Sequence, residues 1–233
     1  MNTKKLLEQL LKSGQSMLQE QSGRSGKRPS SGTGFGSSGL GGSLGQSLGK
    51  GALASSAFSL LMGSKRGRKM GMKGLKYGGL AALGVLAYRA YSDWQQQNAA
   101  TAPAEPPRTI DRLSGSEAEA HSHAILKALV AAAKADGHID DRERQLIEEE
   151  LGKLADDGET RAWLETELNK PLDPKEVASA STSLEMASEM YLVSLMMVDD
   201  KNYMERAYLD ELARNLKLDA SLKASLESQA EQA

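Results

Sequence analysis

The sequence predicts an all-α domain in the second half of the chain, preceded by a glycine-rich half with one or two short apolar helices. From residue 116 on, apolar residues recur with the 3.6-residue period of helices, and no stretch has the two-residue alternation of strands. An acid-rich corner at Asp136-Gly137 has a weaker copy near Asp200. Two related helical hairpins, packed about a pseudo-twofold axis, are the architecture that these observations predict.

Each predicted helix has one apolar face that would pack into a shared core. Apolar residues at helical spacing define four such faces: Ile125, Leu129, Ala132 and Ala133; Leu146, Ile147, Leu151 and Leu154; Met186, Met190, Val193 and Met197; and Tyr208, Leu209, Leu212 and Leu216. Shorter helices are expected over residues 159–168, with Trp163 and Leu164 inward, and over residues 174–180. The second begins at Asp173-Pro174, which supplies an N-cap and a proline at the first helical position.

Charge and glycine divide the chain into two unlike halves. Residues 1–108 contain 15 Lys and Arg against 4 Asp and Glu, whereas residues 109–233 contain 14 against 27. Of the 23 glycines, 19 precede residue 109, where ordering the backbone would cost much entropy. The predicted organisation is an amphipathic helix over residues 1–21, a Gly/Ser-rich flexible tract over 22–50, an apolar and basic membrane-associating segment over 51–98, a Pro/Ala-rich linker over 99–115, and an acidic helical domain over 116–233.

The N-terminal helix is expected to dock on a partner or to lie on a surface. Its apolar residues fall on one helical face, with charged residues elsewhere: Leu6, Leu7, Leu10 and Leu11. A helix this short is marginal alone, so it needs a surface to pack against.

Residues 51–94 are expected to contact membrane lipid. The apolar stretches at 51–63 and 77–88 are each shorter than the roughly 17 residues that a spanning helix needs. The second extends over residues 75–91 if Lys76 and Arg89 reach toward the surface, and Tyr and Trp flank it as at a membrane interface. Six basic residues, with no acidic residue among them, precede it and would be attracted to anionic lipid: Lys65, Arg66, Arg68, Lys69, Lys73 and Lys76.

The side of the membrane on which the acidic domain would lie depends on how residues 75–91 are inserted. A single span would leave the basic cluster in the cytoplasm and the acidic domain outside, whereas a hairpin or a surface-lying segment would keep both inside. Nucleic acid is not expected as a partner, because glycine, leucine and alanine interleave the basic residues in place of base-stacking aromatics.

Helix capping accounts for most residues of the first acidic corner. Gly137 suits the left-handed conformation that ends a helix, and Asp140 with Glu143 has the N-cap to N3 spacing of a capping box. Asn202 and Glu205 repeat this spacing in the second corner.

The sharper hypothesis for these corners is a divalent-cation site. Asp136, Asp140 and Glu143 offer oxygen ligands that suit Ca²⁺ or Mg²⁺, and Asp200 and Glu205 would complete the shell if the two corners face each other. The pattern is not that of an EF-hand, whose loop has a glycine at the sixth position and a glutamate at the twelfth. Capping and cation binding both remain compatible with the sequence.

The sequence does not predict an enzyme. The absence of cysteine excludes disulfides, thiol catalysis and zinc–thiolate sites. A nucleophile with a base, a phosphate loop or a dinucleotide fingerprint does not occur in its required context. His121 and His123 are two residues apart, so they diverge on a helix and are expected on a solvated face.

The stretch ALVAAAKADGHIDDRERQLIEEEL, residues 128–151, resembles the TerB-like (tellurite-resistance) domain family, in which an apolar helix runs through an Ala-Asp-Gly loop into an acid-rich helix. The order of segments, from the opening MNTKKLLEQLL through the glycine-rich middle to this domain, looks like the YebE-type inner-membrane proteins of unknown function. The resemblance implies an all-helical fold of two pseudo-symmetric halves, association with the bacterial inner membrane, and a metal-binding acidic surface carried by Asp136, Asp140, Glu143, Asp200 and Glu205. Asp200-Lys201 replaces Asp-Gly in the second corner, so the two corners are not equivalent.

The expected function is therefore that of a non-enzymatic protein at the bacterial inner membrane. Its acidic domain would present a surface to a protein partner or a divalent cation, in envelope stress or in metal and oxyanion (tellurite) stress. The alternative is a soluble, cation-responsive protein-interaction module with no membrane insertion.

Overall fold

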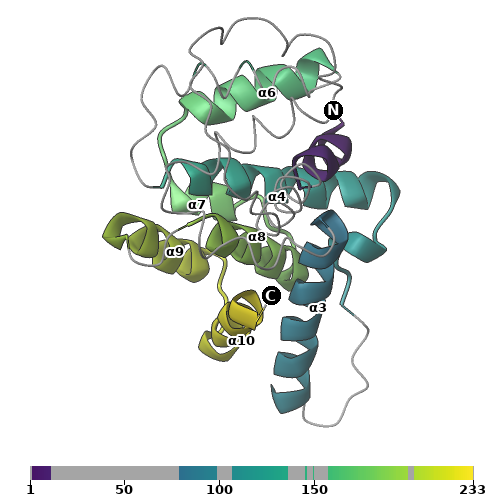
Figure 1. Ribbon diagram of the computed structural model, residues 1–233, viewed down its shortest axis with the longest axis vertical. Helices are drawn as coiled ribbons and strands as arrows, with labels where there is room; N and C mark the ends of the chain where they lie inside the picture. The colour runs from purple at the N-terminus through teal and green to yellow at the C-terminus, as the bar shows by residue number, and fades with distance from the viewer. Residues whose placement is uncertain are drawn as a thin grey trace, which may run out of the picture.

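A computed structural model describes residues 2–11, 79–98, 107–135, 145, 149, 157–198 and 202–232, and every element bounded within them is helical (Figure 1). A first helix covers residues 3–11. The others are α3 (Gly79–Asn98), the 3₁₀ helix η4 (Ile110–Arg112), α4 (Gly115–Ala133), α6 (Gly158–Asn169), α7 (Pro174–Ala178), α8 (Leu184–Met197), α9 (Tyr203–Asn215) and α10 (Ala220–Gln232). The predicted all-α class is confirmed.

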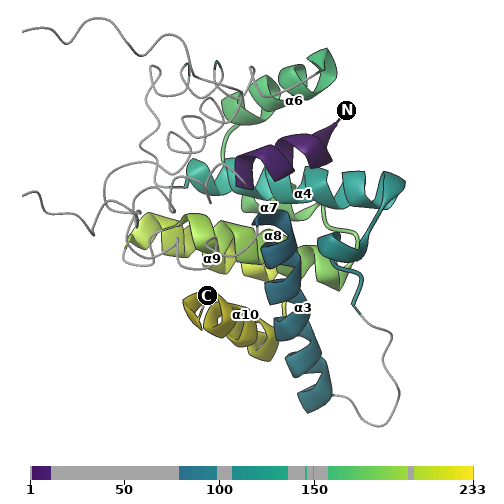
Figure 2. The ribbon, with the colours of Figure 1, turned by 45° about the vertical axis from the view of Figure 1, so that its right-hand side comes forward.

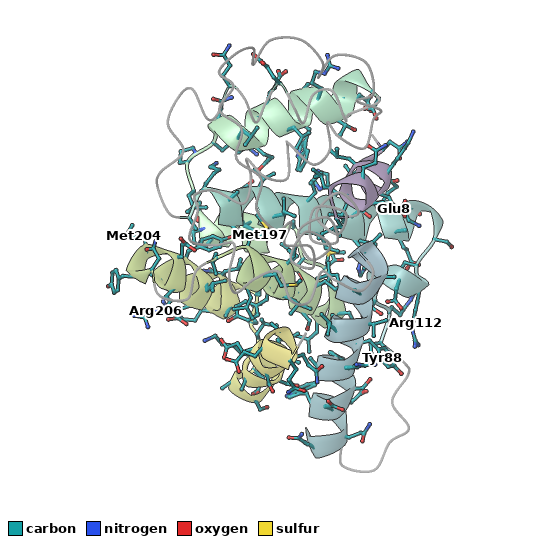
Figure 3. The ribbon with its side chains drawn as sticks, in the orientation of Figure 1. Glu8, Tyr88, Arg112, Met197, Met204 and Arg206 are labelled. Carbon is teal, nitrogen blue, oxygen red and sulfur yellow. The ribbon has the colours of Figure 1, made fainter. Side chains whose placement is uncertain are left out.

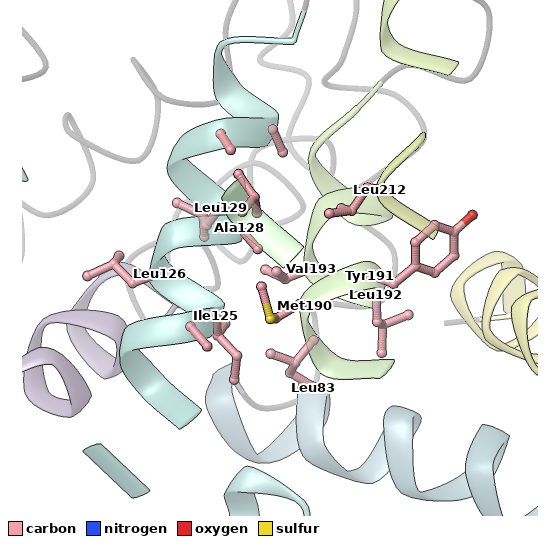
Figure 4. Close-up of a cluster of buried hydrophobic side chains, with 14 of the residues drawn as sticks. Leu83, Ile125, Leu126, Ala128, Leu129, Met190, Tyr191, Leu192, Val193 and Leu212 are labelled. Atoms are coloured by element: carbon pink, nitrogen blue, oxygen red, sulfur yellow. The ribbon is translucent and has the colours of Figure 1, made fainter. Parts of the chain in front are cut away.

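Helices α4 and α8 lie side by side at the centre and form the core (Figure 4). Ile125 and Leu129 of α4, and Met190 of α8, are completely buried. In α8, ten of the fourteen residues are buried, so this helix is covered on nearly every side, as is typical of a helix at the centre of a fold.

The apolar faces predicted for α4, α8 and α9 are confirmed. Ten of their members are buried and two more pack against the core with partial exposure. The buried ones are Ile125, Leu129, Ala132, Met186, Met190, Val193, Tyr208, Leu209, Leu212 and Leu216, and the partly buried ones are Ala133 and Met197. The face predicted over residues 146–154 lies outside the described residues.

The N-terminal helix over residues 3–11 covers the side of α4 that faces away from α8 (Figures 2 and 4). Its four leucines are at most 3% exposed, and Leu126 of α4 points toward it. The Glu119 carboxylate of α4 caps this helix, because its Oε2 accepts hydrogen bonds from the backbone N–H of Thr3 (3.0 Å) and Lys4 (3.3 Å) and from the Thr3 hydroxyl (2.8 Å). The surface on which this amphipathic helix docks is therefore the chain's own α4.

Helix α3 packs its apolar face against α8 and α10. On that face Leu83, Ala87 and Ala90 are at most 3% exposed. Although α3 precedes the predicted 99–115 linker, it shares one core with the helices that follow this linker. None of the helices in the described ranges is both long and apolar enough to cross a membrane.

The 3₁₀ helix η4 is fixed against α3 by two close contacts. A Cβ atom at Gly84 would lie 2.3 Å from Asp111 Oδ1, so only glycine allows this approach. The Arg112 guanidinium stacks 4.0 Å from the centre of the Tyr88 ring (Figure 3). These contacts hold the start of the second half of the chain onto the helix that ends the first half.

Side-chain N-caps begin α6, α7, α8 and α9. The capping oxygens belong to Asp157, Asp173, Ser183 and Asn202, each of which accepts a backbone N–H two or three residues ahead. The predicted start of α7 at Asp173-Pro174 is confirmed, whereas its end comes at Ala178, two residues earlier than predicted. In α6, Leu164 is buried as predicted and Trp163 is partly buried.

Candidate functional site

Four of the five predicted cation ligands lie outside the described residues: Asp136, Asp140, Glu143 and Asp200. Within the described part of the chain, no group of three or more His, Asp or Glu side chains is arranged to hold a metal ion. The cation hypothesis therefore depends on what the described residues around the two corners show.

The two corners follow helices that run in the same direction. Near the start of the pair, His121 Nδ1 lies 2.9 Å from Glu189 Oε2, and further along both helices Ser194 Oγ lies 3.5 Å from the Ala128 carbonyl oxygen. In Figure 4, Met190 accordingly lies beside Ile125, and Val193 beside Ala128. The described residues that precede the corners, Ala135 after α4 and Val198 after α8, thus lie at the same end of the helix pair.

This parallel arrangement fits a pseudo-twofold axis that runs parallel to the two helices, because an axis perpendicular to them would make them antiparallel. The parallel axis would relate the first helix of one hairpin to the first helix of the other. The two helices would then run in parallel, and equivalent residues would lie at the same height along the axis. The contact between Ala128 and Ser194 joins residues 66 apart, close to the 64-residue offset between Asp136 and Asp200. The described ends of the two helices are therefore equivalent in their placement, although Lys201 breaks the equivalence of the two corner sequences.

At the second corner the capping prediction is confirmed for Asn202. Its side-chain oxygen accepts a hydrogen bond from the Met204 N–H at 3.0 Å, and its amide nitrogen donates to Glu205 Oε1 at 3.0 Å. Glu205 is only 8% exposed and is the one predicted cation ligand among the described residues. The Glu205 carboxylate therefore contacts the residue that caps α9.

A buried His–Glu pair joins α4, α8 and η4, and the sequence did not reveal it. Glu189 is completely buried; its Oε1 accepts the Ile110 N–H at 2.5 Å while its Oε2 contacts His121. Burial raises the pKa of Glu189, although the hydrogen bonds from His121 and Ile110 act in the opposite direction. The expectation that His121 lies on a solvated face is wrong, because the parallel register of α4 and α8 brings it onto Glu189.

A second polar cluster attaches α6 and α7 to α4. Lys127 Nζ donates to Glu176 Oε1 at 2.6 Å, and Lys170 pairs with both Glu167 and Glu176. Lys134, at the end of α4, donates to the backbone carbonyls of Glu167 and Lys170. These cations satisfy acceptors of the same domain, so the cluster holds the fold together at the end of α4 that leads into the first corner.

His123 packs against α6. Its ring lies 4.5 Å from the Trp163 ring, between centroids, and partial burial lowers its pKa, with the charge of Lys127 adding to that effect. The solvated face predicted for His123 is therefore wrong as well. The sequence signal that could have indicated both contacts is the apolar run that directly follows the two histidines, in which every residue from Ala124 to Ala132 is buried.

The described residues thus form an all-helical arrangement around two parallel central helices, whose described ends at Ala135 and Val198 lie on the same side of the fold. The chain belongs to the family described as a protein of unknown function (DUF533), whose model matches residues 47–230. It is 32% identical over 103 residues to the "Uncharacterized protein in ampR 5'region" of Yersinia enterocolitica, an alignment that covers 44% of this chain and 74% of that relative. No solved structure matches the chain significantly.

Proposed function

We propose that the protein is a TerB-like, YebE-type protein of the bacterial inner membrane, without enzymatic activity, whose acidic domain binds a divalent cation or a protein partner. The observation that carries the proposal is the shared direction of α4 and α8. It supports a joint site because Ala135 and Val198, which lead into the two corners, lie at one end of the helix pair. Carboxylates contributed by both corners would suit Ca²⁺ or Mg²⁺.

Calorimetric titration of Ca²⁺ and Mg²⁺ into the full chain tests the cation site. We expect saturable binding that is lost in the variant Asp136→Asn/Glu143→Gln. The matched control is Glu117→Gln/Glu165→Gln, which removes the same two charges from exposed positions on α4 and α6 and should bind as the wild type does. Absence of binding, or equal binding by both variants, would leave the corners as helix caps and direct attention to a protein partner.

Membrane association is the second part of the proposal. It is supported by the six basic residues between 65 and 76, which directly precede α3 and would be attracted to anionic headgroups. Flotation with phosphatidylglycerol vesicles should recover the full chain with the lipid. A Lys65→Gln/Arg66→Gln/Arg68→Gln/Lys69→Gln variant should float less, and release of the wild type by high salt alone would argue against an inserted segment.

The alternative function is a soluble, cation-responsive interaction module. The packing of α3 favours it, because the apolar face expected to meet lipid is covered by α8 and α10. A chain that binds the cation but does not float with vesicles of any charge would support this alternative.

A further inference from the structure

We infer that α10 is a displaceable cover over the part of the apolar face of α3 that contains Ala90 and Trp94, and that an anionic lipid surface competes with α10 for this part. The inference rests on the proposed membrane association and adds the step by which the membrane gains access to α3.

The face of α3 that would suit lipid is the one that the fold covers. Leu83, Ala87, Ala90 and Trp94 recur at intervals of four, three and four residues and share one side of the helix. The first three are at most 3% exposed, and Trp94 is partly buried.

The opposite side of α3 carries charge and faces solvent. Arg89 and Asp93, four residues apart, are both exposed there. Helix α3 is therefore amphipathic, with the form of a helix that lies in a membrane interface and not of one that crosses a bilayer. The six basic residues that precede it in the sequence make an anionic surface the matching partner.

Helix α10 lies beside α3 (Figure 2), and few of its side chains are buried there. Leu222 and Leu226 are its only buried residues, and they have to offset the entropy of ordering a 13-residue helix. Its polar contacts with α3 are the hydrogen bond from Ser225 Oγ to the Ala90 carbonyl oxygen, at 3.1 Å, and the contact of Trp94 with Asp219 at the start of α10.

The other polar contacts of α10 with the core are made by its own partly exposed side chains Lys223 and Glu227. The Tyr191 hydroxyl of α8 donates to Glu227 at 2.8 Å (Figure 4 shows its ring turned toward α10), and Lys223 lies 3.0 Å from Asp210 of α9. The Tyr191 hydroxyl is buried, so its hydrogen bond to Glu227 helps to hold α10, whereas the Lys223–Asp210 ion pair is reached by water and contributes little to stability.

The connection between α9 and α10 allows α10 to move without loss of α9. Helix α9 ends in its own capping motif, in which Leu218 N–H donates to the Ala213 carbonyl at 3.1 Å and Lys217 has a left-handed φ of 56°. Only residues 216–219 separate α9 from α10, so a change of backbone angles at the end of this connection would move α10 away as a unit.

Two features of the sequence make the inference testable in the full chain. The protein has no cysteine, so an introduced pair can form only one disulfide within a chain. It has two tryptophans, so Trp163→Phe leaves Trp94, on the covered face, as the only tryptophan fluorophore.

The experiment adds phosphatidylglycerol vesicles with brominated acyl chains to the Trp163→Phe protein carrying Ala90→Cys/Ser225→Cys. When the cysteine pair is reduced, lipid should quench the fluorescence of Trp94. When the pair is oxidised, the disulfide locks α10 on α3 and the quenching should be lost. Reduction of the disulfide should restore the quenching. Ser225→Cys alone is the control and should respond equally under both conditions. A Leu222→Asn variant, which weakens the cover without a lock, should be quenched at lower lipid concentration than its parent.

The outcomes separate this inference from the proposed function. Both the locked and the reduced protein could float with the vesicles and show the same quenching of Trp94, or no quenching. In that case α10 does not control access to α3 and the inference is wrong, whereas membrane association stands. If no form binds the vesicles, the proposed membrane association is wrong and the inference is lost with it.

Discussion

Helices α8 and α10 are almost equal in length, 14 and 13 residues, yet the fold holds them in very different ways. Ten residues of α8 are buried, against two of α10. Helix α8 also carries the buried Glu189, whose carboxylate joins three elements, whereas the polar contacts of α10 are made by partly exposed groups. The core built on α4 and α8 is thus the frame of the fold, and α10 is a cover on its side.

The largest expected effect in this comparison comes from the buried carboxylate of α8. Glu189→Ala should lower the free energy of unfolding by about 3–5 kcal/mol, because it leaves His121 and the Ile110 N–H buried without their acceptor. The matched control is Asp210→Ala on α9, which removes the exposed ion pair with Lys223 of α10 and should cost less than about 1 kcal/mol. Urea unfolding measures both, and equal losses would contradict the contrast between the two helices.

Two leucines allow the same comparison for apolar packing. Leu129→Ala on α4 should cost about 2–5 kcal/mol, since the centre of the core cannot collapse around the cavity. Leu226→Ala on α10 should cost less global stability, because α10 can detach before the frame unfolds. In the second variant Trp94 fluorescence, measured with Trp163→Phe, should change at lower urea than far-ultraviolet circular dichroism; coincident transitions would show that α10 unfolds together with the core.

The pH dependence of stability provides a third test of the frame. Burial raises the pKa of Glu189 above the value of about 4.3 that a glutamate has in the unfolded chain. At a pH between these two pKa values, the native state therefore holds a proton that the unfolded state has lost. The resulting stabilisation is complete below about pH 4.3 and is lost as the pH rises through the folded pKa. The free energy of unfolding of the wild type minus that of Glu189→Gln should therefore fall with rising pH over this window. A difference that stays constant or rises would contradict the direction of this shift.

The smallest expected effect on stability comes from a substitution in the connection between α9 and α10. Lys217 has the left-handed conformation that glycine adopts without strain, so Lys217→Gly should stabilise the α9 cap by about 0.5–1 kcal/mol. Lys217→Ala is the control, because alanine keeps the strain while removing the charge, and it should bring no such gain. Thermal unfolding distinguishes the two, and a loss of stability in Lys217→Gly would mean that the flexibility of glycine outweighs the relief of strain.

The sequence predicted the frame well because its signals are local. The spacing of Met186, Met190 and Val193 defines the buried face of α8, and Asp173-Pro174 defines the start of α7. Such features depend on residues only a few positions apart, so they can be recognised without the tertiary structure.

The contacts between distant segments could not be predicted in this way. His121 and Glu189 are 68 residues apart, and only the register of two parallel helices brings them together. The apolar residues of α3 form the same sequence pattern whether protein or lipid covers them. Arg89 and Asp93, which share one side of this helix, indicate that it has a single apolar face. The predicted cation ligands of the two corners, Glu205 included, stay predictions.

Hydrogen exchange of the full chain, with and without phosphatidylglycerol vesicles, tests the contrast between frame and cover most directly. Without lipid, the amides of α10 should exchange faster than those of α4 and α8, because local opening of α10 costs less free energy than unfolding of the core. Vesicles should speed the exchange of α10 further while α4 and α8 stay protected. Equal protection of α8 and α10, unchanged by lipid, would contradict the account.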